Sequence, residues 1–219
     1  MCDRVMSKGV QHMKKTTLGE LIANAISHGV GVLFAIIFLV LLITKADSTP
    51  EVLSSLVFGI AMIILYLSST LFHSFPEEMK RVYNVFQRLD HSSIFLLITG
   101  TYTPFLVLAA DNTKGYILLG ILWLITVVGI IFKSIWIERY KYVHLALYLI
   151  MGWSIVFVWN DINANLGDSF LFLLLGGISY TLGVVFYVSK FKYAHFVWHI
   201  FVLGGSILHF FAIWIILGP

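Results

Sequence analysis

Seven long apolar segments, each almost free of charge, follow one another along the chain. They cover residues 21–43, 52–72, 92–110, 115–132, 142–159, 169–189 and 195–217. A helix needs about 20 residues to cross the hydrocarbon core of a membrane, so each segment is long enough to span it once. The strands of an outer-membrane barrel would instead alternate apolar and polar residues over about ten positions. The pattern therefore predicts an all-α integral membrane bundle of seven transmembrane helices.

The composition agrees with this pattern. Hydrophobic residues make up 59% of the chain and charged residues 11%, whereas soluble globular domains contain about 25% charged residues. This balance excludes an ordinary soluble domain. We expect one membrane domain over residues 18–219, preceded by a cytoplasmic N-terminal tail over residues 1–17, and no second soluble domain.

The basic residues divide unequally between the two sides of the predicted bundle. Twelve belong to the tail and to the second, fourth and sixth connections, and two to the other side. The twelve are Arg4, Lys8, Lys14, Lys15, Lys80, Arg81, Arg88, Lys133, Arg139, Lys141, Lys190 and Lys192, and the two are Lys45 and Lys114. Short cytoplasmic loops carry the excess of Lys and Arg. We therefore expect a multi-pass cell-membrane protein with its N-terminus cytoplasmic and its C-terminus outside. Attraction to anionic headgroups accounts for the positive charge, which indicates no nucleic-acid partner.

Four ionisable side chains gather at the predicted cytoplasmic ends of three segments. His73 ends the second segment and Asp90 immediately precedes the third. His195 and His199 begin the seventh and share one helical face, because they are four residues apart. Ser69 lies one turn deeper than His73 on the same face. Ionisable groups in membrane segments are rare and usually functional, so their convergence predicts a site at this boundary.

Three imidazoles and a carboxylate suit a zinc site. We expect His73, His195 and His199 to be the ligands, since three histidines that leave one position open for water are typical of catalytic Zn²⁺. Asp90 would orient that water or accept its proton, and Ser69 would hold the same water or a substrate carbonyl. Zinc activates bound water and polarises a carbonyl, so the expected reaction is hydrolysis of an amide or ester. A site at the inner leaflet favours a membrane lipid as substrate or ligand.

Less specific interpretations exist for several of these residues. A His-x-x-x-His pair is common on protein surfaces without a metal, and Asp90 could also cap the third helix. Glu20, Asn24 and His28 recur every four residues at the start of the first segment. This polar stripe could support the metal site, line a cavity or form hydrogen bonds between helices.

Three further histidines receive no functional assignment. His91 projects about 100° away from Asp90 around the helix axis, which favours a structural or interfacial role. His144 has no companion on the predicted cytoplasmic side and is expected to face solvent or headgroups. His209 lies about 21 Å beyond His195 along the last helix, too far to share its ion.

Several spaced motifs carry a resemblance to a known family. They are E-x-x-x-N-x-x-x-H over residues 20–28, S-x-x-x-H-S-F-P over 69–76, L-D-H-x-x-I over 89–94, GTYTPF over 100–105 and H-x-x-x-H over 195–199. Together, and in this order, they resemble the hemolysin III family. That family is the bacterial branch of the progestin and adipoQ receptor superfamily, which is related more distantly to alkaline ceramidases.

The resemblance implies a zinc site and a bacterial plasma-membrane location. By similarity, His73, His195 and His199 would bind zinc and Asp90 would contact the zinc-bound water. The family name also implies a cytolytic activity in some bacterial members. Two functions of different class therefore stay open: a zinc-dependent lipid amide or ester hydrolase, and a non-enzymatic membrane sensor or pore-forming cytolysin whose zinc is structural.

Overall fold

The structure, a computed structural model, describes residues 16–136 and 140–218. Ten helical elements make up this part of the chain, which contains no strand. They are α1 (Leu18–Lys45), α2 (Thr49–Ser74), α3 (Lys80–Pro104), the π-helix η1 (Phe105–Ala110), α4 (Thr113–Ile135), α5 (Lys141–Trp153), the 3₁₀-helix η2 (Ser154–Val158), α6 (Trp159–Leu166), α7 (Ser169–Val188) and α8 (Ala194–Ile216). Most of the N-terminal tail, residues 1–15, lies outside the described residues.

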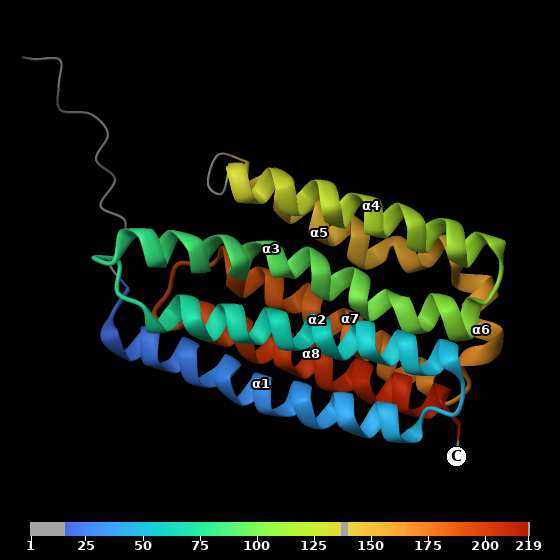
Figure 1. The fold of residues 1–219 in the computed structure, drawn as a ribbon. Coiled ribbons are helices and arrows are strands. Elements are labelled where there is room, and N and C mark those ends of the chain that lie inside the picture. The colour runs from blue at the N-terminus through green and yellow to red at the C-terminus, as the bar shows by residue number, and fades with distance from the viewer. Residues whose placement is uncertain (1–15, 137–139, 219) are drawn as a thin grey trace, which may run out of the picture.

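The helices lie side by side in one bundle (Figure 1). Helix α2 packs between α1 and α3, and α8 packs against both α7 and α1. Seven stretches of the described chain are helical, long enough and apolar enough to cross a membrane. The predicted all-α bundle of seven transmembrane helices is thus confirmed. We call the end of the bundle at which α1, α3 and α8 begin and α2 ends the basic end, after the lysines and arginines of its connections.

Paired hydrogen bonds start the first two helices. The Thr17 side chain accepts a hydrogen bond from the backbone N–H of Glu20, and the Glu20 carboxylate accepts one from the backbone N–H of Thr17. Ser48 and Glu51 form the same capping box ahead of α2. Such reciprocal bonds satisfy backbone N–H groups that have no partner within the helix. They set where each helix begins, and therefore the depth of every residue that follows on it.

The third span begins much earlier than the apolar pattern predicts. Helix α3 starts at Lys80, whereas the apolar segment starts at residue 92. The additional turns carry polar residues and extend past the apolar run, which marks only the part of a helix that can sit in hydrocarbon. Asp90 consequently lies inside α3, and the interpretation of Asp90 as a helix N-cap is wrong.

The fifth span is interrupted where the sequence predicts one continuous helix. Helix α5 ends at Trp153, η2 follows, and α6 completes the crossing. At the break, the Tyr102 hydroxyl from α3 donates to the Gly152 carbonyl at 2.8 Å and accepts from the Ile155 N–H at 2.9 Å. A side chain inserted into the hydrogen-bond ladder is a known cause of a helix distortion. The break shapes the wall of the cavity described below.

Candidate metal centre

Three imidazoles from two helices meet at the basic end of the bundle. His73 comes from the end of α2, and His195 and His199 come from the first two turns of α8. One ligand nitrogen from each ring lies within 4.8 Å of the others. The ring centroids are 4.6–5.2 Å apart. Metal–nitrogen bonds of about 2.0–2.1 Å would draw these nitrogens somewhat closer together. The cluster could therefore hold a metal ion.

The tautomer of His199 follows from its hydrogen bonds. Its Nδ1 lies 3.1 Å from Ser27 Oγ and 3.3 Å from the backbone carbonyl oxygen of Asn24. The Ser27 hydroxyl donates its own hydrogen bond to the same backbone carbonyl oxygen, at 2.9 Å. Since the carbonyl only accepts and the hydroxyl hydrogen is already donated, the imidazole proton must sit on Nδ1. The lone pair is left on Nε2, the arrangement usual for a metal-binding histidine held by the backbone.

His28 stacks directly on His199. Their ring centroids are 3.5 Å apart and their planes differ by 10°. His28 is 3% exposed, and neither of its ring nitrogens has a hydrogen-bonding partner among the described residues. The buried Nε2 of His73 likewise has none. Buried polar atoms without partners are costly, so these imidazoles are chemically suited to a cation or water at the cluster.

Asp90 and Ser69 lie at the same end of the cavity as the histidines. The Asp90 side chain is 14% exposed, toward the cavity, and its Oδ2 lies 3.4 Å from His91 Nδ1. That His91 nitrogen also lies 2.8 Å from the Gln87 carbonyl oxygen of its own helix, which fits the structural role expected for His91. The Ser69 hydroxyl is buried and lies next to the Asp90 carboxylate. A carboxylate and a hydroxyl thus belong to residues that line the same cavity as His195 and His199.

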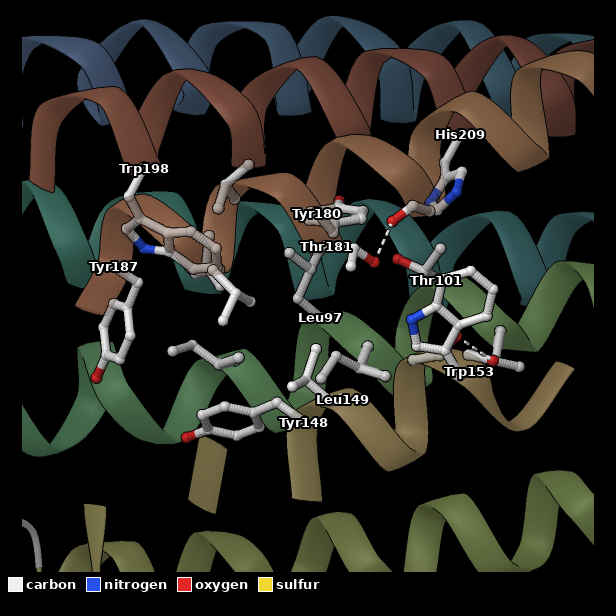
Figure 2. A pocket seen from close by; sticks show the side chains of 18 of the residues that line it. Leu97, Thr101, Tyr148, Leu149, Trp153, Tyr180, Thr181, Tyr187, Trp198 and His209 are labelled. Atoms are coloured by element: carbon white, nitrogen blue, oxygen red, sulfur yellow. Dashed lines mark hydrogen bonds between the residues drawn. The ribbon is translucent and has the colours of Figure 1, made fainter. Parts of the chain in front are cut away.

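An apolar cavity of about 580 Å³ extends from this polar end toward the opposite end of the bundle. Helices α3, α5, α7 and α8 supply most of its walls. Figure 2 shows aromatic side chains along it, among them Tyr148, Trp153, Tyr187 and Trp198. The volume lies within the range of small-molecule pockets, about 300–1,000 Å³. His195 and His199 line one end, and His209 lines the other.

The polar stripe on α1 divides between two roles. Glu20 caps α1 and accepts a hydrogen bond from the backbone N–H of Tyr193 at 3.0 Å, just before α8. It therefore ties α1 to the start of the helix that carries two candidate ligands. Asn24 contributes its backbone carbonyl oxygen, not its side chain, to the hydrogen bond with His199, and His28 stacks on the same ring. The stripe faces the histidine cluster rather than lipid.

Two findings lie beyond the sequence analysis. His144 is 3% exposed, so the expectation that it faces solvent or headgroups is wrong: α5 turns it toward Phe95, 6.3 Å away between ring centroids. Ser27, which bonds His199, was not a candidate. A serine in a membrane helix usually bonds a carbonyl of its own helix, so nothing in its local sequence distinguishes it.

A bundle of seven membrane-spanning helices with a histidine cluster at one end defines the class of this protein. The family model described as haemolysin-III related matches residues 18–210. The chain belongs to this family, and it is a multi-pass cell-membrane protein.

Relatives from bacteria and mammals support this membership. A "Hemolysin-3 homolog" of Bacillus subtilis (strain 168) is 42% identical over 202 residues, covering 90% of this chain and 94% of the relative. "Hemolysin-3" of Bacillus cereus is 42% identical over 199 residues, covering 89% and 90%. The human "Monocyte to macrophage differentiation factor" is 31% identical over 205 residues, covering 91% and 85%. The resemblance to the hemolysin III family and its wider superfamily is thus confirmed.

Proposed function

We propose that the protein binds Zn²⁺ through His73, His195 and His199 and hydrolyses an amide or ester bond of a membrane lipid. One observation carries the proposal: two of the three imidazoles, those of His195 and His199, line the polar end of an apolar cavity with Asp90 and Ser69, and His73 lies next to them in the histidine cluster. An aliphatic chain would occupy the apolar part and present its carbonyl to the polar end. Zinc is preferred because neutral imidazoles are good ligands for it.

The metal, when bound, supplies a Lewis acid that polarises a carbonyl and acidifies water. The side chains would perform the remaining steps. The Asp90 carboxylate takes a proton from the attacking water as its oxygen bonds to the carbonyl carbon. The same carboxyl then returns the proton to the departing nitrogen or oxygen as the carbon–heteroatom bond breaks. The Ser69 hydroxyl donates a hydrogen bond to the carbonyl oxygen, where negative charge develops.

Metal content tests the ligand assignment. Purified full-length protein should carry about one zinc ion per chain, and His195→Ala should lose most of it, because a three-ligand site depends on each ligand. His144→Ala removes another buried imidazole, outside the cluster, and should keep the metal. Elemental analysis after removal of loosely bound ions measures both. Equal metal in the wild type and in His195→Ala would refute the assignment.

Turnover separates catalysis from binding. Asp90→Asn preserves the size of the side chain but removes its basicity, so it should retain zinc and lose at least about a hundredfold of lipid amide or ester hydrolysis. Mass spectrometry of products from a panel of long-chain amides and esters measures this. Hydrolysis at the wild-type rate in the Asp90→Asn protein would rule out the assigned role.

The non-enzymatic alternative rests on the names of the bacterial relatives, which include "Hemolysin-3". It predicts a metal-loaded wild type that hydrolyses none of the panel. Release of dye from vesicles or lysis of erythrocytes by wild type and His195→Ala would then show whether a membrane-damaging activity depends on the metal. Zinc-dependent hydrolysis without any lysis supports the enzyme.

A further inference from the structure

A second polar site, formed by His209 and Thr101 and called the distal station here, lies at the far end of the cavity. His209 follows His199 by ten residues on α8, about 15 Å further along the helix axis. Its side chain is 6% exposed, and its Nε2 lies 3.1 Å from the Leu173 carbonyl oxygen. Because that oxygen only accepts, Nε2 carries the ring proton and Nδ1 carries the lone pair. Nδ1 is buried and has no hydrogen-bonding partner among the described residues.

A second polar group without a partner approaches from α3. Thr101 is 6% exposed and lines the same cavity, and its Oγ1 bonds to nothing in the described part of the chain. Figure 2 shows Thr101 and His209 at the same end of the cavity. Phe105, the first residue of η1, lies 6.0 Å from the His209 ring between centroids. His209 Nδ1 and Thr101 Oγ1 are thus two covered polar atoms without a partner among the described residues, and both belong to residues that line this end of the cavity (Figure 2).

The neighbouring hydroxyls of this region already have partners. Thr181 donates to the Gly177 carbonyl at 2.8 Å. Tyr180 and Ser206 share a hydrogen bond of 2.7 Å. They cannot easily turn toward His209 and Thr101 without breaking these bonds. None of these neighbours therefore offers a free group to His209 Nδ1 or Thr101 Oγ1.

The position of the His209 ring is set by its surroundings. The ring packs against Gly176 of α7, where a Cβ atom would collide with the imidazole. Tyr180 lies 5.4 Å away on another side. With Nε2 held by the Leu173 carbonyl, the ring cannot turn Nδ1 toward another partner. The fold therefore fixes the direction of the lone pair on His209 Nδ1.

We propose that this distal station binds a hydroxyl group carried partway along the aliphatic chain of the ligand. The hydroxyl donates to His209 Nδ1 and accepts from Thr101 Oγ1, so one group satisfies both. A keto group accepts from Thr101 but has no proton for His209, and a methylene group serves neither. The expected order of affinity is hydroxyl, then keto, then unsubstituted chain. The inference rests on the proposed function only for the lipid nature of the ligand.

Binding of three fatty acids of equal length tests the proposal. They carry a hydroxyl, a keto group or no substituent at the chain position about 15 Å from the carboxyl end. Full-length protein in detergent is titrated while the fluorescence of the cavity tryptophans, Trp153, Trp159 and Trp198, is followed. The hydroxy acid should bind about tenfold more tightly than the unsubstituted acid, as two modest hydrogen bonds allow. Equal affinities in the wild type would overturn the proposal and leave water as the partner of both groups.

Variants separate the two contacts from general effects on the fold. Thr101→Val is isosteric and removes only an unpaired hydroxyl, so it should fold normally and lose most of the preference while still binding the unsubstituted acid. Thr103→Val is the matched control, because Thr103 lies on the same helix and donates to the Thr99 carbonyl at 2.9 Å. The control should keep the preference. His209→Phe should also lose it, with thermal unfolding measured alongside because the Leu173 carbonyl loses its donor.

The outcomes distinguish this inference from the proposed hydrolysis. Binding is measured without turnover, so a preference for the hydroxy acid in a protein that hydrolyses nothing would sink only the enzymatic function. Hydrolysis that is indifferent to the chain hydroxyl, in wild type and Thr101→Val alike, would sink only the distal station.

Discussion

At the scale of single residues, the most informative contact is the one behind a candidate ligand. His199 Nδ1 is directed at Ser27 Oγ and the Asn24 carbonyl oxygen, and this leaves Nε2 as the nitrogen with a lone pair. Helix α1 thus supplies none of the three proposed ligands, yet it selects the tautomer of one. The orientation of that ring is fixed before any ion arrives, which lowers the entropy lost on binding.

Replacing the Ser27 hydroxyl tests this dependence. Ser27→Ala removes one of two acceptors for the His199 proton, so zinc affinity should fall about tenfold, a typical effect of losing such a supporting contact. Competition with a chromogenic chelator measures the affinity. Ser54→Ala is the control, since Ser54 is a buried serine whose hydroxyl donates to the Glu51 carbonyl near the start of α2. An unchanged affinity in Ser27→Ala would mean that the Asn24 carbonyl alone orients the ring.

At the scale of elements, the interruption of the fifth span depends on a side chain from the third. Tyr102 on α3 bridges the Gly152 carbonyl and the Ile155 N–H. These two backbone groups have a partner only because α3 and α5 pack together. The same break places Trp153 and Ile155 on the cavity wall, so a contact that stabilises the fold also shapes the binding space.

Removal of the Tyr102 hydroxyl should therefore be costly. Tyr102→Phe leaves a donor and an acceptor without their partner inside the bundle, and the free energy of unfolding should fall by about 1–2 kcal/mol. Chemical unfolding in mixed detergent measures it. Tyr116→Phe removes a hydroxyl that donates to Asp111 at 2.7 Å on an exposed surface, so its effect should be near zero. Equal stability of the two variants would show that the break forms without the tyrosine.

At the scale of the whole molecule, the two ends of the bundle differ in chemistry. The basic end holds the histidine cluster and Asp90, while the interior between the ends is an apolar cavity with one further polar station at His209. The distribution of Lys and Arg predicts that the basic end is cytoplasmic. A ligand would then enter from the inner leaflet, with its polar group near the cytoplasmic boundary.

Reporter fusions test this orientation. With twelve basic residues on one side and two on the other, alkaline phosphatase fused after Pro219 should be active, because it folds only outside the cytoplasm. A fusion of the same reporter within the second connection, beside Lys80, should be inactive. The reverse result would invert the topology and place the candidate metal centre on the outer side.

The sequence alone was sufficient for the class of fold and for the candidate ligands. Seven apolar runs identify the spans because a membrane helix must be apolar along its entire length in hydrocarbon. The residues His73, His195 and His199 could be grouped because topology places helix ends on alternate sides. Grouping these residues required their predicted depth in the membrane and, for His195 and His199, the helical periodicity that puts both on one face.

Contacts between helices were decided only by the tertiary structure. The bond from Ser27 to His199, the stacking of His28 and the break held by Tyr102 each join residues far apart in the chain, and hydropathy carries no information on which face meets which. The early start of α3 escaped prediction because its first turns are polar, and the buried place of His144 because its neighbours belong to another helix. The local composition of a segment indicates its depth in the membrane, whereas the rotation and pairing of helices depend on the packing of all seven together.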